Sequence, residues 1–239
     1  MHSPEDYYIN PFVATFVRGI RWLALFAVLY SSAIYVSLVT FHPEMIPTEL
    51  LFSIAASRET IPFPAVVEVL LMEGAFELIR EAGLRVPTLV GPTIGIVGAV
   101  ILGQAAVQAR VVSPILVVVV ALSGLSSFAI PNYDLGLAAR LTRFLMIAMA
   151  SILGIPGLTV MTMVLLIYVF SLRSFGVPIT APLVPAWPHA PDILGIGPVW
   201  MMRNRPGHLR PLDRERQPAN ARASVRFTRR RRTPGGEHK

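Results

Sequence analysis

Charged residues of both signs interrupt an otherwise apolar part of the sequence, EVLLMEGAFELIREAGLRVP. The charges belong to Glu68, Glu73, Glu77, Arg80 and Glu81. At about 100° per residue, a helix would place all of these except Glu68 in one stripe, and Glu68 would lie about 140° from Glu73. Carboxylates attract cations, which the Val, Leu, Met, Phe and Ile residues around them do not. The stripe is therefore the part of this sequence best suited to electrostatic chemistry.

Two interpretations of this amphipathic helix remain open at the level of sequence. In the first, the helix lies in the plane of a membrane surface and its glutamates face headgroup water. In the second, the stripe faces a water-filled cavity that protein lines within the membrane. Carboxylates at membrane depth are unfavourable by about 2.5–3.5 kcal/mol each on insertion scales, so they persist mainly where they line ion or substrate paths. The second interpretation makes Glu73 and Glu77 candidates for an ion path.

Small and polar residues recur at helical spacing in the next two apolar runs. A ridge of small residues repeats every four positions, at Gly91, Gly95, Ala99 and Gly103. Such a ridge permits close contact between helices, within one chain or between copies of it. Polar side chains in the same runs either form hydrogen bonds between packed helices or line a pore. They extend the set of ion-path candidates to Gln104, Gln108, Ser123 and Ser127.

The composition indicates that a lipid bilayer is the solvent of this chain. Hydrophobic residues make up 54% and charged residues 15% of its 239 residues, which leaves too little polar surface to cover a water-soluble globule. The absence of cysteine excludes disulfides and thiolate metal sites. The five histidines lack the spacing of a zinc-binding helix, and the sequence contains no Walker loop or nucleophile elbow. We therefore expect no metal, no cofactor and no enzymatic activity.

The apolar runs predict an all-α, polytopic membrane protein with about four to five transmembrane helices plus interfacial or re-entrant helices. The expected apolar stretches are Trp22–Thr40, Val90–Ala109, Val111–Ile130 and Leu135–Leu172. Arg110 alone separates the second from the third, which indicates a tight turn, and Ser113-Pro114 is a helix start. Residues 154–157 divide the last stretch into a re-entrant hairpin or two tilted helices. Four prolines in residues 41–64 favour short interfacial pieces over another span.

Charge divides the chain into a pre-membrane segment of residues 1–21, a membrane domain of residues 22–197 and a tail of residues 198–239. The tail holds 12 basic and 3 acidic residues, whereas the first 197 residues hold 9 basic and 11 acidic ones. Basic residues beside a membrane stay mainly on its cytoplasmic side. We therefore expect a disordered cytoplasmic tail near membrane lipid, with a nucleic-acid partner disfavoured. If the glutamate helix enters the membrane, the same tendency places five further arginines on the cytoplasmic side: Arg80, Arg85, Arg140, Arg143 and Arg173.

Several long motifs match one protein family in order along the chain. They are SPEDYY, FHPEMIPTELLFSIAASRE, PFPAVVEVLLMEGAFELIREAGLRVP, GQAAVQARVVSP, SSFAIPNYDLGLAARLTRF and SFGVPITAPLVP. Through these motifs the chain strongly resembles the A subunit of the GerA family of spore germination receptors. The resemblance runs from Ser3 to Pro198 and is far more specific than any short pattern in the sequence.

The resemblance implies a multi-pass protein of the spore inner membrane that takes part in nutrient sensing. Its partners would be a transporter-like B subunit, a lipoprotein C subunit and further copies of itself. In this family the A subunit is thought to form an oligomeric ion channel that opens when germinant binds elsewhere, mainly on the B subunit. Family A subunits carry a large soluble domain before the SPEDYY-like segment, so we expect this chain to lack that domain.

Two other classes of protein remain as alternatives. A secondary transporter would show paired broken helices in two related halves, and the sequence has one candidate break, at residues 154–157. A membrane scaffold would bind an anionic partner through its arginine-rich tail.

Overall fold

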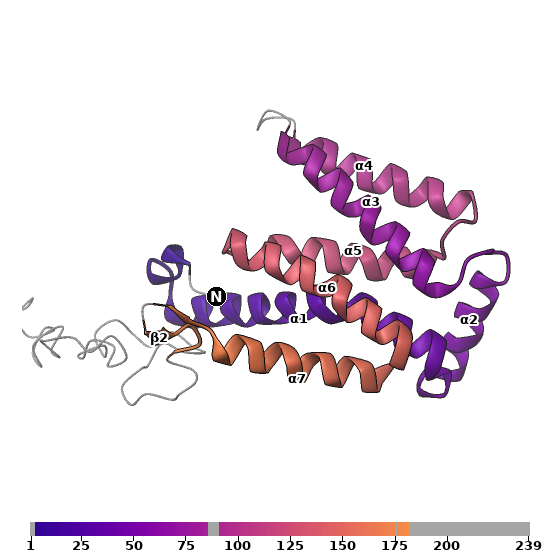
Figure 1. The fold of residues 1–239 in the computed structure, drawn as a ribbon. Coiled ribbons are helices and arrows are strands. Elements are labelled where there is room, and N and C mark those ends of the chain that lie inside the picture. The colour runs from indigo at the N-terminus through magenta and orange to yellow at the C-terminus, as the bar shows by residue number, and fades with distance from the viewer. Residues whose placement is uncertain (1–2, 86–90, 175, 182–239) are drawn as a thin grey trace, which may run out of the picture. The chain divides into compact units, whose positions relative to one another are not determined.

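The computed structural model describes residues 3–85, 91–174 and 176–181, with their side chains except those of residues 84–85, 91–97 and 99. Here the chain forms seven α-helices, which confirms the predicted all-α fold (Figure 1). The helices are α1 Pro11–Phe41, α2 Thr48–Arg58, α3 Ala65–Arg85, α4 Gly91–Gln108, α5 Pro114–Phe128, α6 Tyr133–Leu153 and α7 Ile155–Ser171. The other described elements are the 3₁₀ helices η1 Pro4–Tyr7 and η2 Pro43–Met45 and the paired strands β1 Arg173–Ser174 and β2 Val177–Pro178.

The chain divides into two compact units. The first comprises Ile20–Leu165 and contains the hydrophobic core and the charged face of α3. The second comprises, among the described residues, those before Ile20 and those from Leu166 onwards. The predicted boundaries of the pre-membrane segment, the membrane domain and the tail stay predictions, and residues 182–239 lie outside the described part of the chain.

α1 is longer than the span predicted from Trp22 to Thr40. It begins at Pro11, whose fixed φ suits the first position of a helix. Its 31 residues correspond to about 46 Å, which exceeds the roughly 30 Å of a bilayer's hydrocarbon core. The apolar pattern missed the first turns because Arg18 and Arg21 interrupt it, although arginine is a good helix former.

Two helices in the described residues are long and apolar enough to cross a membrane by length and composition, and they are α1 and α6. α5 and α7 are also apolar but have 15 and 17 residues. The predicted break between α6 and α7 is confirmed, because the helix ends at Gly154 with a positive φ of 68°. The described residues thus contain two candidate spans and two shorter apolar helices, and the number of four to five spans stays a prediction.

The turn between α4 and α5 follows the sequence prediction. Arg110 has a positive φ of 56°, and the backbone N–H of Val111 donates to the carbonyl of Ala106 at 2.9 Å. Ser113 caps α5, because its hydroxyl oxygen accepts a hydrogen bond from the N–H of Leu116 at 3.3 Å. The chain therefore reverses within residues 109–113, which confirms the predicted tight turn around Arg110.

The region of residues 41–64 forms η2 and α2, which confirms the prediction of short pieces. Their predicted position at a membrane interface stays a prediction. The segment after α7 forms the β1–β2 hairpin, in which Gly176 has a φ of 79°.

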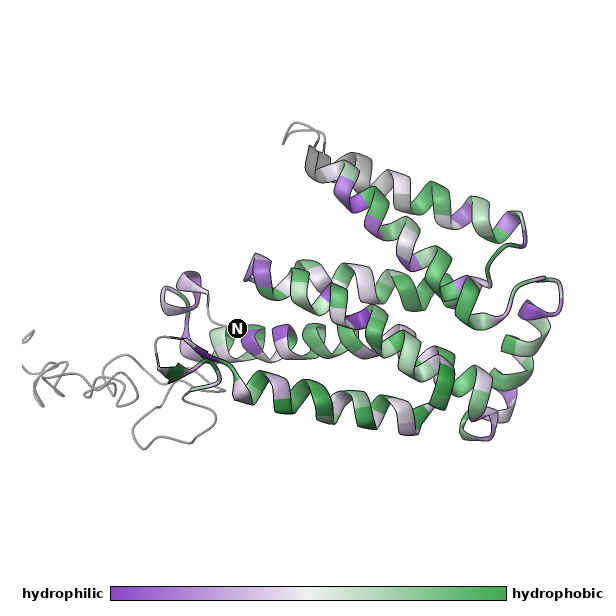
Figure 2. Cartoon of the chain, viewed as in Figure 1, coloured by the Kyte–Doolittle hydropathy of each residue, from purple (hydrophilic) through white to green (hydrophobic). Residues whose placement is uncertain are grey.

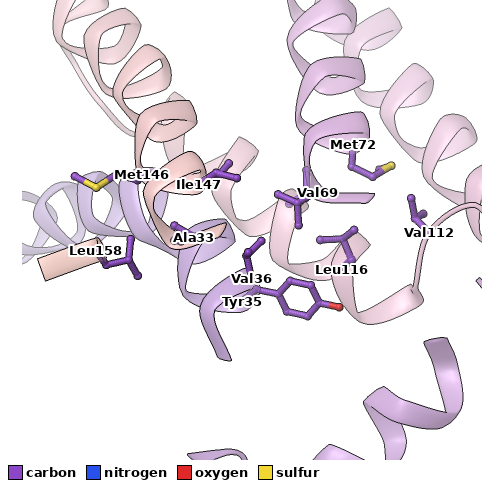
Figure 3. Close-up of a cluster of buried hydrophobic side chains, with 12 residues drawn as sticks. Ala33, Tyr35, Val36, Val69, Met72, Val112, Leu116, Met146, Ile147 and Leu158 are labelled. Atoms are coloured by element: carbon purple, nitrogen blue, oxygen red, sulfur yellow. The ribbon is translucent and has the colours of Figure 1, made fainter. Parts of the chain in front are cut away.

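The hydrophobic core of the first unit joins α1, α3, α5, α6 and α7 (Figure 3). Val69 of α3 lies near Leu116 of α5, and Ile147 of α6 lies near Ala33 of α1 (Figure 3). Most residues of these helices are hydrophobic (Figure 2), and several of the apolar side chains are exposed. Leu141 and Met163 are largely exposed there, which suits contact with lipid better than with water.

Gly154 allows a test of the α6–α7 junction. An added Cβ would lie 3.0 Å from the Cβ of Phe41 and 3.1 Å from Nε2 of His42, and the positive φ disfavours any L side chain. We expect Gly154→Ala to lower the free energy of unfolding by roughly 1–3 kcal/mol, measured by thermal unfolding in detergent. The control is Gly136→Ala in α6, where an added Cβ meets no atom within 4 Å. Equal stability of the two variants would contradict this packing.

Candidate functional site

The face of α3 that the sequence singled out is turned into the protein. Glu68 and Glu73 are fully buried, and Glu77 is only partly exposed. The interpretation that these glutamates face headgroup water is therefore wrong for Glu68 and Glu73. Their charges are balanced instead by arginines from other helices.

Arg143 of α6 lies at the centre of the larger polar cluster. Its Nη1 is 2.9 Å from Oε2 of Glu73 and donates to the Ser123 hydroxyl at 2.6 Å, and its Nη2 donates to Oε1 of Glu77 at 2.8 Å. Arg143 and Glu73 are both 0% exposed. One guanidinium thus bridges two carboxylates and a hydroxyl in a dry environment, where charge-assisted hydrogen bonds are strong.

Two further residues complete this cluster. The hydroxyl of Ser32 in α1 donates to Oε1 of Glu73. Nη1 of Arg140 donates to Oε2 of Glu77 at 3.0 Å, at the more exposed edge of the cluster. The Glu73 cluster, as we name it, consists of Ser32, Glu73, Glu77, Ser123, Arg140 and Arg143. Its residues come from α1, α3, α5 and α6. The two residues from α3 are four apart and the two from α6 are three apart, so each pair shares one face of its helix.

Arg80 fastens α3 to α5 one turn beyond the Glu73 cluster. Its Nη2 donates to the carbonyl of Gly124 at 3.1 Å and to the hydroxyl of Ser127. Its guanidinium carbon lies 4.7 Å from the ring centre of Phe128 and 5.5 Å from that of Phe76, within the range of cation–π attraction. A Cβ on Gly124 would lie 2.4 Å from the Phe76 ring, so glycine permits this close approach.

A second buried cluster, the Glu68 joint, consists of Tyr35, Arg58, Glu68 and Ser113. Nη2 of Arg58, the last residue of α2, is 3.1 Å from Oε1 of Glu68. Oε2 of Glu68 accepts the backbone N–H of Ser113 at 3.1 Å, and the Tyr35 hydroxyl lies 3.2 Å from the Ser113 hydroxyl. One carboxylate therefore ties the end of α2 and the start of α5 to the first turn of α3.

Comparison with known proteins assigns the chain to a family. The family described as Bacillus/Clostridium GerA spore germination protein matches residues 1–208. The chain belongs to the GerA family. It is 47% identical over 216 residues to Spore germination protein KA of Bacillus subtilis (strain 168), which covers 90% of this chain and 40% of that protein. Members of the GerA family are not enzymes, as the sequence predicted.

Two further relatives come from the same organism. Spore germination protein A1 is 46% identical over 182 residues, covering 76% of this chain and 38% of that protein. Uncharacterized membrane protein YfkQ is 42% identical over 208 residues, covering 87% and 40%. The chain thus spans about two fifths of the length of the curated relatives it matches. The name of YfkQ and the two candidate spans agree with the prediction of a membrane protein. No solved structure matches the chain.

The structure of this GerA chain brings together only some of the predicted site residues. Glu73, Glu77 and Ser123 meet in the Glu73 cluster. Ser127 lies one turn beyond it, where its hydroxyl accepts a hydrogen bond from Arg80. Gln104 and Gln108 are exposed on α4 and belong to neither cluster. The proposed roles of all these residues in an ion path stay predictions.

The small-residue ridge is described at one of its four positions. Gly103 is buried, and an added Cβ there would lie 3.3 Å from Cγ1 of Val117, so Gly103 packs against α5 of the same chain. The side chains at Gly91, Gly95 and Ala99 lie outside the described residues. A role of the ridge between copies of the chain stays a prediction.

Sequence reasoning missed the partners of the glutamates. It treated Arg140 and Arg143 as charges that fix the cytoplasmic side, but both are buried within α6 and pair with α3. Their predicted position on the cytoplasmic side of a membrane stays a prediction. The available signal was a pair of glutamates four residues apart and a pair of arginines three residues apart, each pair on one face of an apolar helix. No group of three or more His, Cys, Asp or Glu side chains in the described ranges is arranged to hold a metal ion.

The Glu68 joint predicts that neutralising Glu68 destabilises the fold much more than neutralising Glu49. Glu68→Gln leaves Arg58 without a countercharge, and we expect a loss on the order of 3 kcal/mol in the free energy of unfolding. Glu49→Gln on the exposed side of α2 is the matched control and should change stability by under about 0.5 kcal/mol. Thermal unfolding followed by tryptophan fluorescence measures both, and similar midpoints would argue against the joint.

Proposed function

We propose that this chain is the membrane part of an A-type subunit of a spore germination receptor. In this proposal it is a multi-pass protein of the spore inner membrane, and its basic tail faces the cytoplasm. The family match over residues 1–208 supports the assignment. The candidate spans α1 and α6, with the shorter apolar helices α5 and α7, support a chain that crosses the bilayer more than once.

The proposed activity is passage of cations through an oligomer when nutrient is sensed. The observation that carries it is the acidic face of α3, where Glu73 and Glu77 lie within a bundle whose outer surface is apolar. Carboxylates at such a position are unfavourable unless they have a function or a partner. We propose that Glu73 and Glu77 attract cations in the conducting state, and that Ser123 and Ser127 line the same path.

The exposed side of α4 supports contact between copies of the chain. Gln104 and Gln108 are exposed one turn apart, close in sequence to exposed Val100 and Ile101. Moving a side-chain amide from water into hydrocarbon without a hydrogen-bond partner costs several kcal/mol. Glutamines avoid this cost where they form hydrogen bonds across helix interfaces. We propose that this side of α4 packs on a neighbouring copy. The transporter-like B subunit and the lipoprotein C subunit are the further proposed partners, on the strength of the family alone.

A chimera tests the proposed function. The part of Spore germination protein KA that matches this chain is replaced by this chain, and the product is expressed in spores that lack the parent protein. We expect nutrient-triggered germination, followed by the fall in optical density, with release of cations from the spores.

Charge-neutralised variants test the role of the α3 carboxylates in the same spores. Glu73→Gln with Glu77→Gln should lower triggered cation release on the order of tenfold, because the attraction for cations is removed. The matched control is Glu49→Gln with Glu59→Gln, which neutralises two exposed glutamates of the α2 region. Cation flux through liposomes that contain the full 239-residue chain provides a second measurement. Flux that survives the Glu73/Glu77 change in both systems would sink this part of the proposal.

A further inference from the structure

Arg143 of α6 occupies the acidic face of α3. Its guanidinium lies against both carboxylates that are proposed to attract cations, 2.9 Å from Glu73 and 2.8 Å from Glu77. We propose that Arg143 is an internal counter-cation that keeps this path closed, and that opening moves α6 away from α3. We call this contact, in which Arg140 and Arg143 of α6 hold Glu73 and Glu77 of α3, the lock. Its role in conduction rests on the proposed function, but the contact itself can be tested separately.

The contacts of Arg143 are those of an occupied cation position. All three partners of its two terminal nitrogens are oxygen atoms, from two carboxylates and the Ser123 hydroxyl. Arg143 and Glu73 are fully buried, so a passing cation does not reach Glu73 while the arginine is in place. The carboxylates then exert little attraction on other cations, because their charge is balanced at contact distance.

The remaining contacts decide which helix moves. Arg80 holds α3 on α5 through the Gly124 carbonyl and the Ser127 hydroxyl, and Ser32 holds Glu73 on α1. α6 contacts the acidic face through Arg140 and Arg143. A shift of α6 therefore separates the arginines from the glutamates while α3 keeps its place against α1 and α5. The released carboxylate of Glu73 retains the Ser32 hydroxyl as a donor.

The exposed edge of the cluster gives the separation a starting point. The Arg140 and Glu77 side chains are 11% and 25% exposed, so water can replace their mutual hydrogen bond before the buried pair parts. Arg143 has more partners and no exposure, and it is therefore the stronger half of the lock. Interfaces of this kind tend to have two discrete arrangements and no continuous range between them.

The lock is tested by the distance between α3 and α6 in the full chain in liposomes. The chain contains no cysteine, so Leu78→Cys and Leu141→Cys provide unique, exposed positions for two spin labels on these helices. In this background Arg143→Gln should lengthen the mean label distance or add a second, longer population. Arg173→Gln, which removes an exposed arginine after α7, should leave the distribution unchanged.

A second measurement separates the lock from conduction. Arg143→Gln should raise cation flux without nutrient on the order of tenfold, because both carboxylates are released. Glu73→Gln with Glu77→Gln should also lengthen the label distance, but without a rise in flux. Arg143→Lys keeps the charge and loses the planar fork, so it should give an intermediate distance and flux.

The label distance tests the lock, and the cation flux tests the proposed conduction. The lock is overturned if Arg143→Gln leaves the label distance unchanged, whatever the cation flux. It is also overturned if both Arg143 variants keep the label distance and the cation flux of the parent chain. A longer distance in Arg143→Gln without flux in any variant supports the lock and contradicts the proposed conduction. If Arg143→Gln does not fold, the distance in Arg143→Lys decides, because that variant retains the buried charge.

Discussion

Buried charge is the constraint on which the rest of this structure depends. Arg143 and Glu73 are both removed from solvent, and a charge in such surroundings is tolerated only beside an opposite charge. α6 must therefore cross α3 at a height that brings Arg143 to Glu73 and Glu77. The Ser123 hydroxyl adds α5 to the same crossing, and the Ser32 hydroxyl adds α1. The apolar core fills the space between helices, but it is less selective about register, because hydrophobic contacts are not directional.

This arrangement places charge inside and apolar side chains outside, as the bilayer favours. Leu141 and Met163 lie exposed on the outer faces of α6 and α7, whereas the arginines of α6 point to its glutamate partners. A water-soluble bundle would gain little from such an interior, because well-packed apolar residues are often as stable as a buried ion pair. A buried ion pair has the further property that it can be exchanged for other partners. That property is what the proposed conduction path and its lock have in common.

α3 connects the two polar clusters. Glu68 lies in its first turn and receives Arg58 from α2 and the backbone N–H of Ser113 from the start of α5. Glu73 and Glu77 lie further along the same helix and receive α6. A helix transmits displacement along its axis with little loss, so the Glu68 joint and the Glu73 cluster are mechanically linked through one rigid element. The short helix α2, which presents exposed Leu50 and Phe52, is therefore attached to the helix that carries the proposed ion path.

The sequence alone determined the local structure and the family. Helix-forming runs, the turn at Arg110, the cap at Ser113 and the break at Gly154 all depend on neighbours in the chain, and each is confirmed. Helical spacing also identified Glu73 and Glu77 as members of one polar stripe. Only the tertiary structure decided what that stripe faces, because Arg143 is 66 residues from Glu77 in sequence and periodicity gives the direction of a side chain but not its partner. The same reason explains why the sequence assigned Arg140 and Arg143 to a side of the membrane but gave them no partner on α3, since a buried arginine and an exposed one look identical until the opposing helix is in place.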